Sequence, residues 1–256
     1  MHINYQFKRD LIHACQILYR QGYLTSMDGN LSLRLEEGVI LTTPTGRNKG
    51  WIREDDLVLC DLNGNSFDKS KRPSTELKMH MKVYEQRPDV KAVVHCHPVF
   101  ATVYAASDRN LDGCYLTESI VAIGSVPKAE LATPSTEEIP SSIAPLIEQN
   151  DMILLANHGA LAYGIDLEAA VSRMEALEHF AKLSYYLELA NIQNEVDPET
   201  VHRLENLRAS YGFSENLGSC RKASKGESSP ATSKSGLLDS DDIKEITALI
   251  IQELNK

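Results

Sequence analysis

Two histidines in the segment KAVVHCHPV have a spacing that could bind a metal ion. The apolar run before them and Pro98 after them predict the end of a buried strand. Side chains two residues apart on a strand point to the same face, so His95 and His97 can bind one cation together, while Cys96 points to the other face. Taken alone, the pair fits equally well two exposed or hydrogen-bonded histidines near a strand end.

A third histidine and a glutamate could complete such a site. His158, in ANHGALAYG, follows an apolar strand predicted at 152–156, and strand ends are where α/β folds place active-site groups. Glu76, in RPSTELKMH, lies just inside a helix start, where its simpler role is to stabilise the first turn. Imidazoles and a carboxylate form zinc sites, and that carboxylate can act as a general base. His80, one turn later, is interpreted as structural or as lying behind the ligands.

Three short segments of small polar residues could bind a phosphate group. They are Gly29 and Asn30 in MDGNLS, Thr45 and Gly46 in TTPTGRN, and Ser74 and Thr75 at the predicted helix start. Hydroxyl groups, an amide and free backbone N–H groups can hold a dianion without a cluster of lysines, and either Arg47 or Lys49 would add charge. Each segment is, by itself, an ordinary turn or cap.

The elements that must position these residues alternate along the chain, which predicts an α/β fold. Apolar spacing predicts helices at 5–21, 73–86, 136–148, 167–192 and 198–211, and one from about Phe100. Strands are predicted within 26–50 and at 57–61, 90–97, 116–123 and 152–156, with a hairpin turn at Asn63 and Gly64. The helix at 167–192 is a candidate for subunit packing, although plain core packing explains it equally well.

Composition narrows the class of protein. A chain of 256 residues that is 42% hydrophobic can bury a full core, and no apolar run is long enough for a membrane helix or a signal peptide. A formal charge of −10 disfavours a nucleic-acid partner. The five cysteines, Cys15, Cys60, Cys96, Cys114 and Cys220, are widely spaced without a CxxC pair, which predicts reduced thiols in a cytoplasmic protein.

The chain is predicted to have three parts: a catalytic domain at 1–213, a flexible linker at 214–238 and an amphipathic helix at 239–256. The linker is rich in serine and lysine and has too few apolar residues to fold. Beyond it, Ile243, Ile246, Ile250 and Leu254 form one apolar stripe. A single helix of this length is marginal in water, so it is expected to dock on this protein or on a partner.

The motifs GNLS, TPTG, PSTE, HCH and NHG, in this order over about residues 10–211, resemble the class II aldolase and adducin family. Five ordered motifs are far more specific than any one of them. The resemblance implies one Zn²⁺ per subunit, held by His95, His97, His158 and Glu76. It assigns the phosphate to Gly29, Asn30, Thr45, Gly46, Ser74 and Thr75. It also implies two tyrosines at the site: Tyr211 from the C-terminal region, and Tyr115 from a neighbouring subunit.

The same resemblance implies a fold, an assembly and a reaction. The fold is a central mixed or mainly antiparallel sheet between helices, in three layers, and four subunits surround a four-fold axis with active sites between neighbours. The reaction cleaves a 1-phosphoketose, L-fuculose 1-phosphate or L-rhamnulose 1-phosphate, to dihydroxyacetone phosphate and L-lactaldehyde. Glu76 would exchange the C3 proton, and Tyr115 or Tyr211 the proton on the C4 oxygen.

Other activities occur on the same scaffold. Pentulose-phosphate 4-epimerases typically have Asp where this chain has Glu76, and dehydratases and decarboxylases share the metal triad. Adducin-like binding modules are non-enzymatic and lose the metal ligands, all of which are present here. The serine-rich linker and short helix resemble encapsulation peptides of bacterial microcompartments, including those that degrade fucose and rhamnose, which implies a shell protein as partner. The alternative is a helix that folds back on its own subunit.

Overall fold

The computed structural model describes residues 5–211 and 218–220. All of the predicted helix at 239–256, and all of the predicted linker except 218–220, lie outside the described residues, so both remain predictions. None of the described helices is long and apolar enough to cross a membrane.

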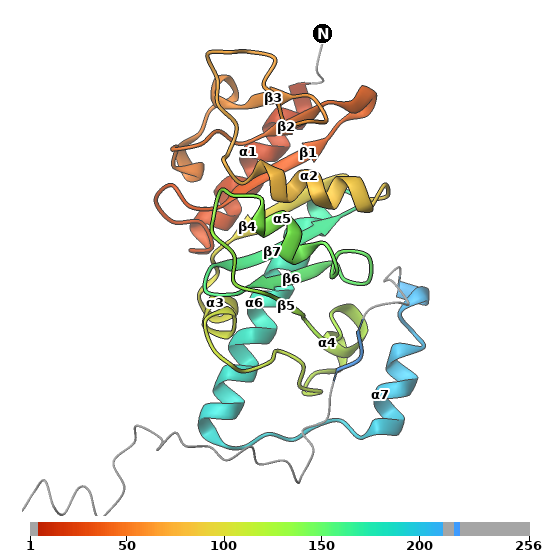
Figure 1. Cartoon of the computed structure of the whole chain (residues 1–256). Helices are drawn as coiled ribbons and strands as arrows, with labels where there is room; N and C mark the ends of the chain where they lie inside the picture. The colour runs from red at the N-terminus through yellow and green to blue at the C-terminus, as the bar shows by residue number, and fades with distance from the viewer. Residues whose placement is uncertain (1–4, 212–217, 221–256) are drawn as a thin grey trace, which may run out of the picture. The chain divides into compact units, whose positions relative to one another are not determined.

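A seven-stranded mixed sheet lies at the centre, in the order β3-β2-β1-β4-β7-β6-β5 (Figure 1). The strands are β1 (Asn30–Arg34), β2 (Ile40–Thr42), β3 (Val58–Cys60), β4 (Ala92–Cys96), β5 (Lys128–Ala129), β6 (Met152–Leu155) and β7 (Gly159–Gly164). Neighbouring strands pair antiparallel except β5 and β6, which are parallel. The predicted mixed sheet flanked by helices is therefore confirmed.

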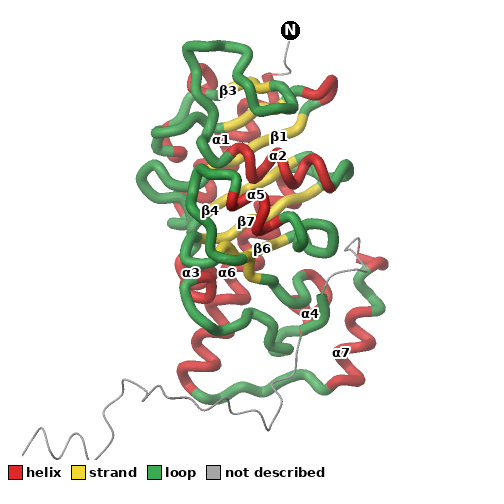
Figure 2. Tube along the Cα trace, in the orientation of Figure 1, coloured by secondary structure: helices red, strands yellow, loops and turns green. Residues whose placement is uncertain are grey.

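Helices cover both faces of this sheet. The α-helices are α1 (Tyr5–Arg20), α2 (Leu77–Gln86), α3 (Val99–Ala105), α4 (Thr117–Ala122), α5 (Glu138–Ile143), α6 (Leu167–Ala190) and α7 (Pro198–Glu205). Short 3₁₀ turns are η1 (Glu36–Gly38), η2 (Lys49–Trp51), η3 (Glu54–Asp56) and η4 (Ala209–Tyr211). Helices α1, α3 and α6 pack against one face, and α2 and α5 against the other, which gives three layers (Figure 2).

Alternation along the strands divides the core into two clusters. In β4, Val94 and Cys96 lie in the cluster under α1, α3 and α6, whereas Val93 lies in the cluster under α2 and α5. His95 shares the parity of Val93, so its side chain is on the side of α2, which begins just after Glu76. A smaller third cluster of Cys114, Ile120, Val201 and Cys220 joins α4 and α7.

Three predictions about secondary structure need correction. The strand predicted at 116–123 is wrong, because α4 occupies it: Ser119, Ile120 and Ile123 are buried at helical spacing, and the residues that begin the helix are exposed. The helix predicted at 136–148 is shorter and ends at Ile143, because Pro145 has no N–H to donate to the helix and its ring crowds the preceding turn. Strands β5 and β7 were not predicted; β7 has two alanines and two glycines, which have low β propensity.

The prediction that all cysteines are reduced is also wrong. Cys114 and Cys220 form a disulfide across 106 residues of sequence, while Cys15, Cys60 and Cys96 are free and buried. The fold brings the pair together, because the Gly218 carbonyl accepts a hydrogen bond from the Ser125 N–H at 2.9 Å. A contact between such distant segments depends on tertiary packing, which cysteine spacing alone does not reveal.

Candidate metal and phosphate site

His95 and His97 reach the same side of the sheet from the end of β4. His95 lies opposite Asn30 on β1 and Leu161 on β7, in the middle of the sheet, and is fully buried. The His97 N–H donates to the Tyr23 carbonyl at 2.9 Å, which fixes the chain just beyond the strand. Cys96 points into the opposite core cluster, as its position between the two histidines predicts.

His158 approaches this pair from the tight turn between β6 and β7. The preceding Asn157 has φ of 54°, a left-handed conformation that asparagine tolerates better than most residues. The following Gly159 lies so close to the His97 ring that a side chain there would collide with it. The NHG motif thus provides both the sharp turn and the close approach that put His158 beside His97.

The three imidazoles and Glu76 converge on one centre. One nitrogen from each of His95, His97 and His158 lies within 4.8 Å of the others. Glu76 Oε1 is 3.2 Å from His158 Nε2, and Oε2 is 3.5 Å from His95 Nε2. Three nitrogens and a carboxylate facing one point are the donor set of a divalent-metal site, so these residues fit a metal ion.

The tautomer and charge of these histidines suit a metal ligand. His95 Nδ1 lies 3.0 Å from the Ala160 carbonyl, which can only accept, so Nδ1 holds the proton and Nε2 faces Glu76 with its lone pair. Burial, then the neighbouring imidazoles, keeps the pKa of His95 well below its ordinary value. Burial also lowers the pKa of His97. Neutral imidazole is the form that binds metal.

Glu76 is held at the N-terminus of α2 by contacts on both sides. Its N–H donates to the Ser74 hydroxyl at 3.2 Å, and Asn30 Nδ2 donates to its Oε2 at 2.9 Å. Asn30 is almost fully buried on β1, directly opposite His95. The GNLS and PSTE motifs are therefore joined through Asn30 and Glu76, so the phosphate segments adjoin the metal triad.

Backbone hydrogen bonds bring the other phosphate segments together. The Ser74 N–H donates to the Thr43 carbonyl at 3.2 Å, the Thr45 N–H to the Arg72 carbonyl at 3.2 Å, and the Thr43 N–H to the Leu31 carbonyl at 3.0 Å. Gly29 and Gly46 both have positive φ, 61° and 65°, and no atom lies near the position of a Gly46 side chain. The three predicted segments thus form one polar rim beside Glu76.

Two residues at this rim were not predicted from the sequence. Asp28, inside the MDGN motif, places Oδ2 at 3.9 Å from His97 Nδ1. Ser135 donates a hydrogen bond from its hydroxyl to Thr75 Oγ1 at 2.8 Å and has φ of 65°. The proximity of Asp28 to Gly29 was an available signal, whereas Ser135 lies in a loop with no motif of its own.

The two predicted tyrosines lie elsewhere in the chain. Burial raises the pKa of Tyr115 to about 12, and the charged groups that act on it are Glu188, Glu195 and Asp112, none of which belongs to the metal cluster. Tyr211 ends η4 with 67% of its surface exposed. Within the described residues, neither tyrosine has a hydrogen bond or ring contact to the three histidines. Their catalytic roles remain predictions.

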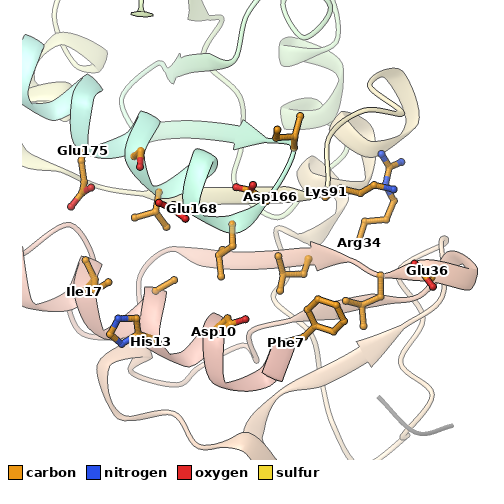
Figure 3. A pocket seen from close by; sticks show the side chains of 17 residues that line it. Phe7, Asp10, His13, Ile17, Arg34, Glu36, Lys91, Asp166, Glu168 and Glu175 are labelled. Atoms are coloured by element: carbon orange, nitrogen blue, oxygen red, sulfur yellow. The ribbon is translucent and has the colours of Figure 1, made fainter. Parts of the chain in front are cut away.

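A separate groove, of about 880 Å³, is lined by none of the predicted site residues (Figure 3). It lies between α1 and the start of α6, above the end of β1. Five acidic residues line it, Asp10, Glu36, Asp166, Glu168 and Glu175, against two basic ones, Arg34 and Lys91. An anionic sugar phosphate would be repelled there, so the groove is a poor candidate for a phosphate site.

The chain is similar in sequence to a known protein family and to several of its named members. Residues 9–185 match the family model of the class II aldolase and adducin N-terminal domain. An L-fuculose phosphate aldolase of Methanococcus maripaludis (strain C7) is 32% identical over 178 residues, which cover 70% of this chain and 96% of that protein. A 3-oxo-tetronate 4-phosphate decarboxylase of Pectobacterium atrosepticum is 33% identical over 188 residues, covering 70% and 84%.

A solved structure shares the fold over a similar length. The structure of an L-fuculose 1-phosphate aldolase superposes with a TM-score of 0.75 at 30% identity, and the match covers 82% of this chain and 98% of that one. Both named activities break a carbon–carbon bond in a phosphorylated compound.

Proposed function

Because the chain belongs to the class II aldolase and adducin family and is a lyase, we propose that it cleaves a 1-phosphoketose between C3 and C4. L-Fuculose 1-phosphate is the first candidate substrate and L-rhamnulose 1-phosphate the second. The products are dihydroxyacetone phosphate and L-lactaldehyde. The observation that supports this proposal is the convergence of His95, His97, His158 and Glu76 beside a polar rim suited to phosphate.

We propose Zn²⁺ as the metal, one per subunit. Three imidazoles and a carboxylate are typical zinc ligands, and the buried contact between His95 Nδ1 and the Ala160 carbonyl is the kind of outer hydrogen bond that orients such ligands. When bound, the ion acts as a Lewis acid for negative charge that develops on the ketose oxygens. No Schiff-base lysine is required.

The proton transfers belong to the side chains. Glu76 exchanges the proton at C3, for which its Oε1 is the better placed oxygen, since Asn30 holds Oε2. Tyr115 or Tyr211 exchanges the proton on the C4 oxygen. The hydroxyl, amide and N–H groups at Gly29, Asn30, Thr45, Gly46, Ser74 and Thr75 bind the phosphate. In this proposal, the residues that bind the phosphate are different from Glu76 and the tyrosine, which transfer protons, except that Asn30 also holds Glu76.

Decarboxylation of a 3-oxo-tetronate 4-phosphate is the second candidate, because a relative with that name is as similar as the aldolases. One panel separates the two: zinc-loaded protein is incubated with L-fuculose, L-rhamnulose and ribulose phosphates and with 3-oxo-tetronate 4-phosphate. Release of dihydroxyacetone phosphate supports the aldolase, and release of CO₂ supports the decarboxylase. If the protein as purified contains no zinc or other divalent ion, and the zinc-loaded protein turns over none of these substrates, the result favours a binding module.

We also propose a homotetramer that works in the cytoplasm, free or inside a bacterial microcompartment. The serine-rich segment followed by the apolar stripe of 239–256 supports targeting to a shell protein. The test fuses 239–256 to a fluorescent carrier in cells that make the shell. Punctate fluorescence supports targeting, and diffuse fluorescence contradicts it.

A further inference from the structure

Lys49 is a buried cation beside the candidate phosphate segments. It is the first residue of η2 and has 2% of its surface exposed, and it is the one lysine that the described part of the chain buries. A buried ammonium group loses favourable hydration and is normally compensated by a carboxylate. The groups that surround the Lys49 ammonium therefore indicate its role.

The hydrogen-bond partner of Lys49 is a neutral group in the first phosphate segment. Its Nζ donates to the Met27 carbonyl at 2.6 Å, two residues before Gly29. Within residues 5–211 and 218–220, no carboxylate lies within 4.0 Å of this Nζ. The carbonyl satisfies a donor but neutralises no charge, so the ammonium group lies beside the Gly29–Asn30 turn without direct contact to a carboxylate of the described residues.

The local sequence directs Lys49 inward. Gly50 lies against the Tyr19 ring of α1, where a side chain would collide, and its N–H donates to the Asn48 side chain at 2.9 Å. With these two contacts, the chain after Thr45 and Gly46 turns back and Lys49 reaches the Met27 carbonyl. One side chain thereby links the second phosphate segment to the first.

The charge of Lys49 acts on both parts of the site. Asp28 and Glu76 are among the charged groups that raise its pKa, although burial has the larger effect and lowers the pKa overall. In turn, Lys49 is one of the charges that lower the pKa of His97. The ammonium group is therefore near enough to influence the phosphate rim and the metal cluster.

We propose that Lys49 is the positioning residue of the phosphate site: it holds the 27–30 turn through the Met27 carbonyl and supplies the positive charge that favours a phosphate dianion. This inference rests on the proposed function, which requires a phosphorylated substrate. Arg47, the other cation of the same loop, has 66% of its side chain exposed and pairs with Asp56 at 3.3 Å, so solvent and a carboxylate already screen its charge.

The test compares Lys49→Met with Arg47→Met in the full-length, zinc-loaded protein. Methionine keeps the length and apolar stem of lysine and removes the charge. Affinity for inorganic phosphate is measured by calorimetry and by the rise in melting temperature that phosphate produces. We expect Lys49→Met to lose phosphate affinity about tenfold to a hundredfold, as charge-assisted contacts do, and to raise KM for the phosphoketose similarly with little change in kcat. Arg47→Met should match the wild type.

Stability without phosphate does not separate this role from a purely structural one, because Lys49→Met loses the bond to the Met27 carbonyl in either case and is expected to melt lower than the wild type. The deciding quantity is the further rise in melting temperature that phosphate produces. We expect this rise to be smaller in Lys49→Met than in the wild type. The inference is overturned if Lys49→Met melts lower with unchanged phosphate affinity, if Arg47→Met shows the loss instead, or if the wild type binds no phosphate. A wild type that binds phosphate through Lys49 but cleaves no phosphoketose refutes the proposed reaction alone.

Discussion

At the scale of single residues, the contacts of Glu76 suit both roles proposed for it, metal ligand and carrier of the C3 proton. Asn30 holds one of its oxygens, and the other faces His158. We expect Glu76→Gln to retain zinc, because three imidazoles remain, and to lose about 10²- to 10⁴-fold in kcat, because an amide cannot exchange the C3 proton. Steady-state kinetics with metal analysis measures both. Glu137→Gln, an exposed carboxylate paired with Lys78, is the control. Unchanged cleavage by Glu76→Gln rules out its role.

His80 gives a prediction about pH and stability. It is fully buried with Nδ1 at 2.7 Å from the Ser32 hydroxyl, and burial lowers its pKa to about 3. Between the ordinary value of about 6.5 and that value, the unfolded chain binds a proton that the native state does not. Its contribution to stability is therefore complete above pH 6.5 and is lost as the pH falls toward 3.

The change that isolates this effect is His80→Gln, which cannot titrate but can still bond to Ser32. Between pH 7 and pH 5, we expect the variant to lose about 2 kcal/mol less free energy of unfolding than the wild type. Urea unfolding in the presence of EDTA measures it without a contribution from metal release. His13→Gln, at an exposed position on α1, serves as control. Equal losses in His80→Gln and the wild type would contradict the assignment.

The same residues show what sequence can reveal at this scale. The spacing of His95 and His97 predicts that their side chains lie on the same face of a strand, because alternation along a strand depends only on neighbouring residues. In the structure both histidines are on the same side of the sheet at the end of β4. His158 and Glu76 come close to His95 only because β4 pairs with β7 and with β1. No local pattern in the sequence encodes this pairing. The prediction that the four residues meet therefore depended on the resemblance of five ordered motifs to a known family. Asp28 and Ser135 were missed because their contacts are made between loops.

At the scale of elements, prediction succeeded where apolar spacing was long and regular. Helix α6 begins at Leu167, where the sequence predicts it, because eight of its residues are buried along its length and Asp166 caps its start. The short segments were less certain: α4 has six residues and was predicted as a strand. In such segments the choice between helix and strand depends on the tertiary cluster around Ile120, which the sequence does not display.

The third core cluster, which contains Cys114 and Cys220, predicts how many free thiols the protein has. The structure pairs Cys114 with Cys220 between the segments that flank α4 and α7, so three of the five cysteines are free. We expect thiol titration of the protein, purified without reductant and denatured, to find three thiols, and five after reduction. Reduction should lower stability by about 2–5 kcal/mol, as the loss of a native disulfide does. Five thiols before reduction would show that the pair is reduced.

At the scale of the whole molecule, one chain brings four candidate metal ligands together, but within residues 5–211 and 218–220 it brings neither Tyr115 nor Tyr211 into contact with the three histidines. Exposed apolar side chains lie on the two helices next to the cluster: Val99, two residues after His97, is 62% exposed, and Val103, Tyr186 and Leu189 are exposed on α3 and α6, which contact each other. Exposed apolar side chains that gather on neighbouring helices are typical of a protein interface. A second copy packed there would place its residues close to His97, which supports the proposed tetramer with sites between subunits.

Mixing two inactive variants tests this arrangement. In a mixed tetramer of Glu76→Gln and Tyr115→Phe subunits, some sites combine an intact Glu76 with an intact Tyr115 from the neighbour, so part of the activity returns. A site built within one chain can recover nothing, because each subunit then lacks one of the two groups. Tyr211→Phe mixed with Glu76→Gln should stay inactive if Tyr211 serves its own subunit. Coexpression, with native mass spectrometry to confirm mixed tetramers, gives the comparison; mixed tetramers without recovered activity for the Tyr115 pair would exclude that tyrosine as the neighbour's acid.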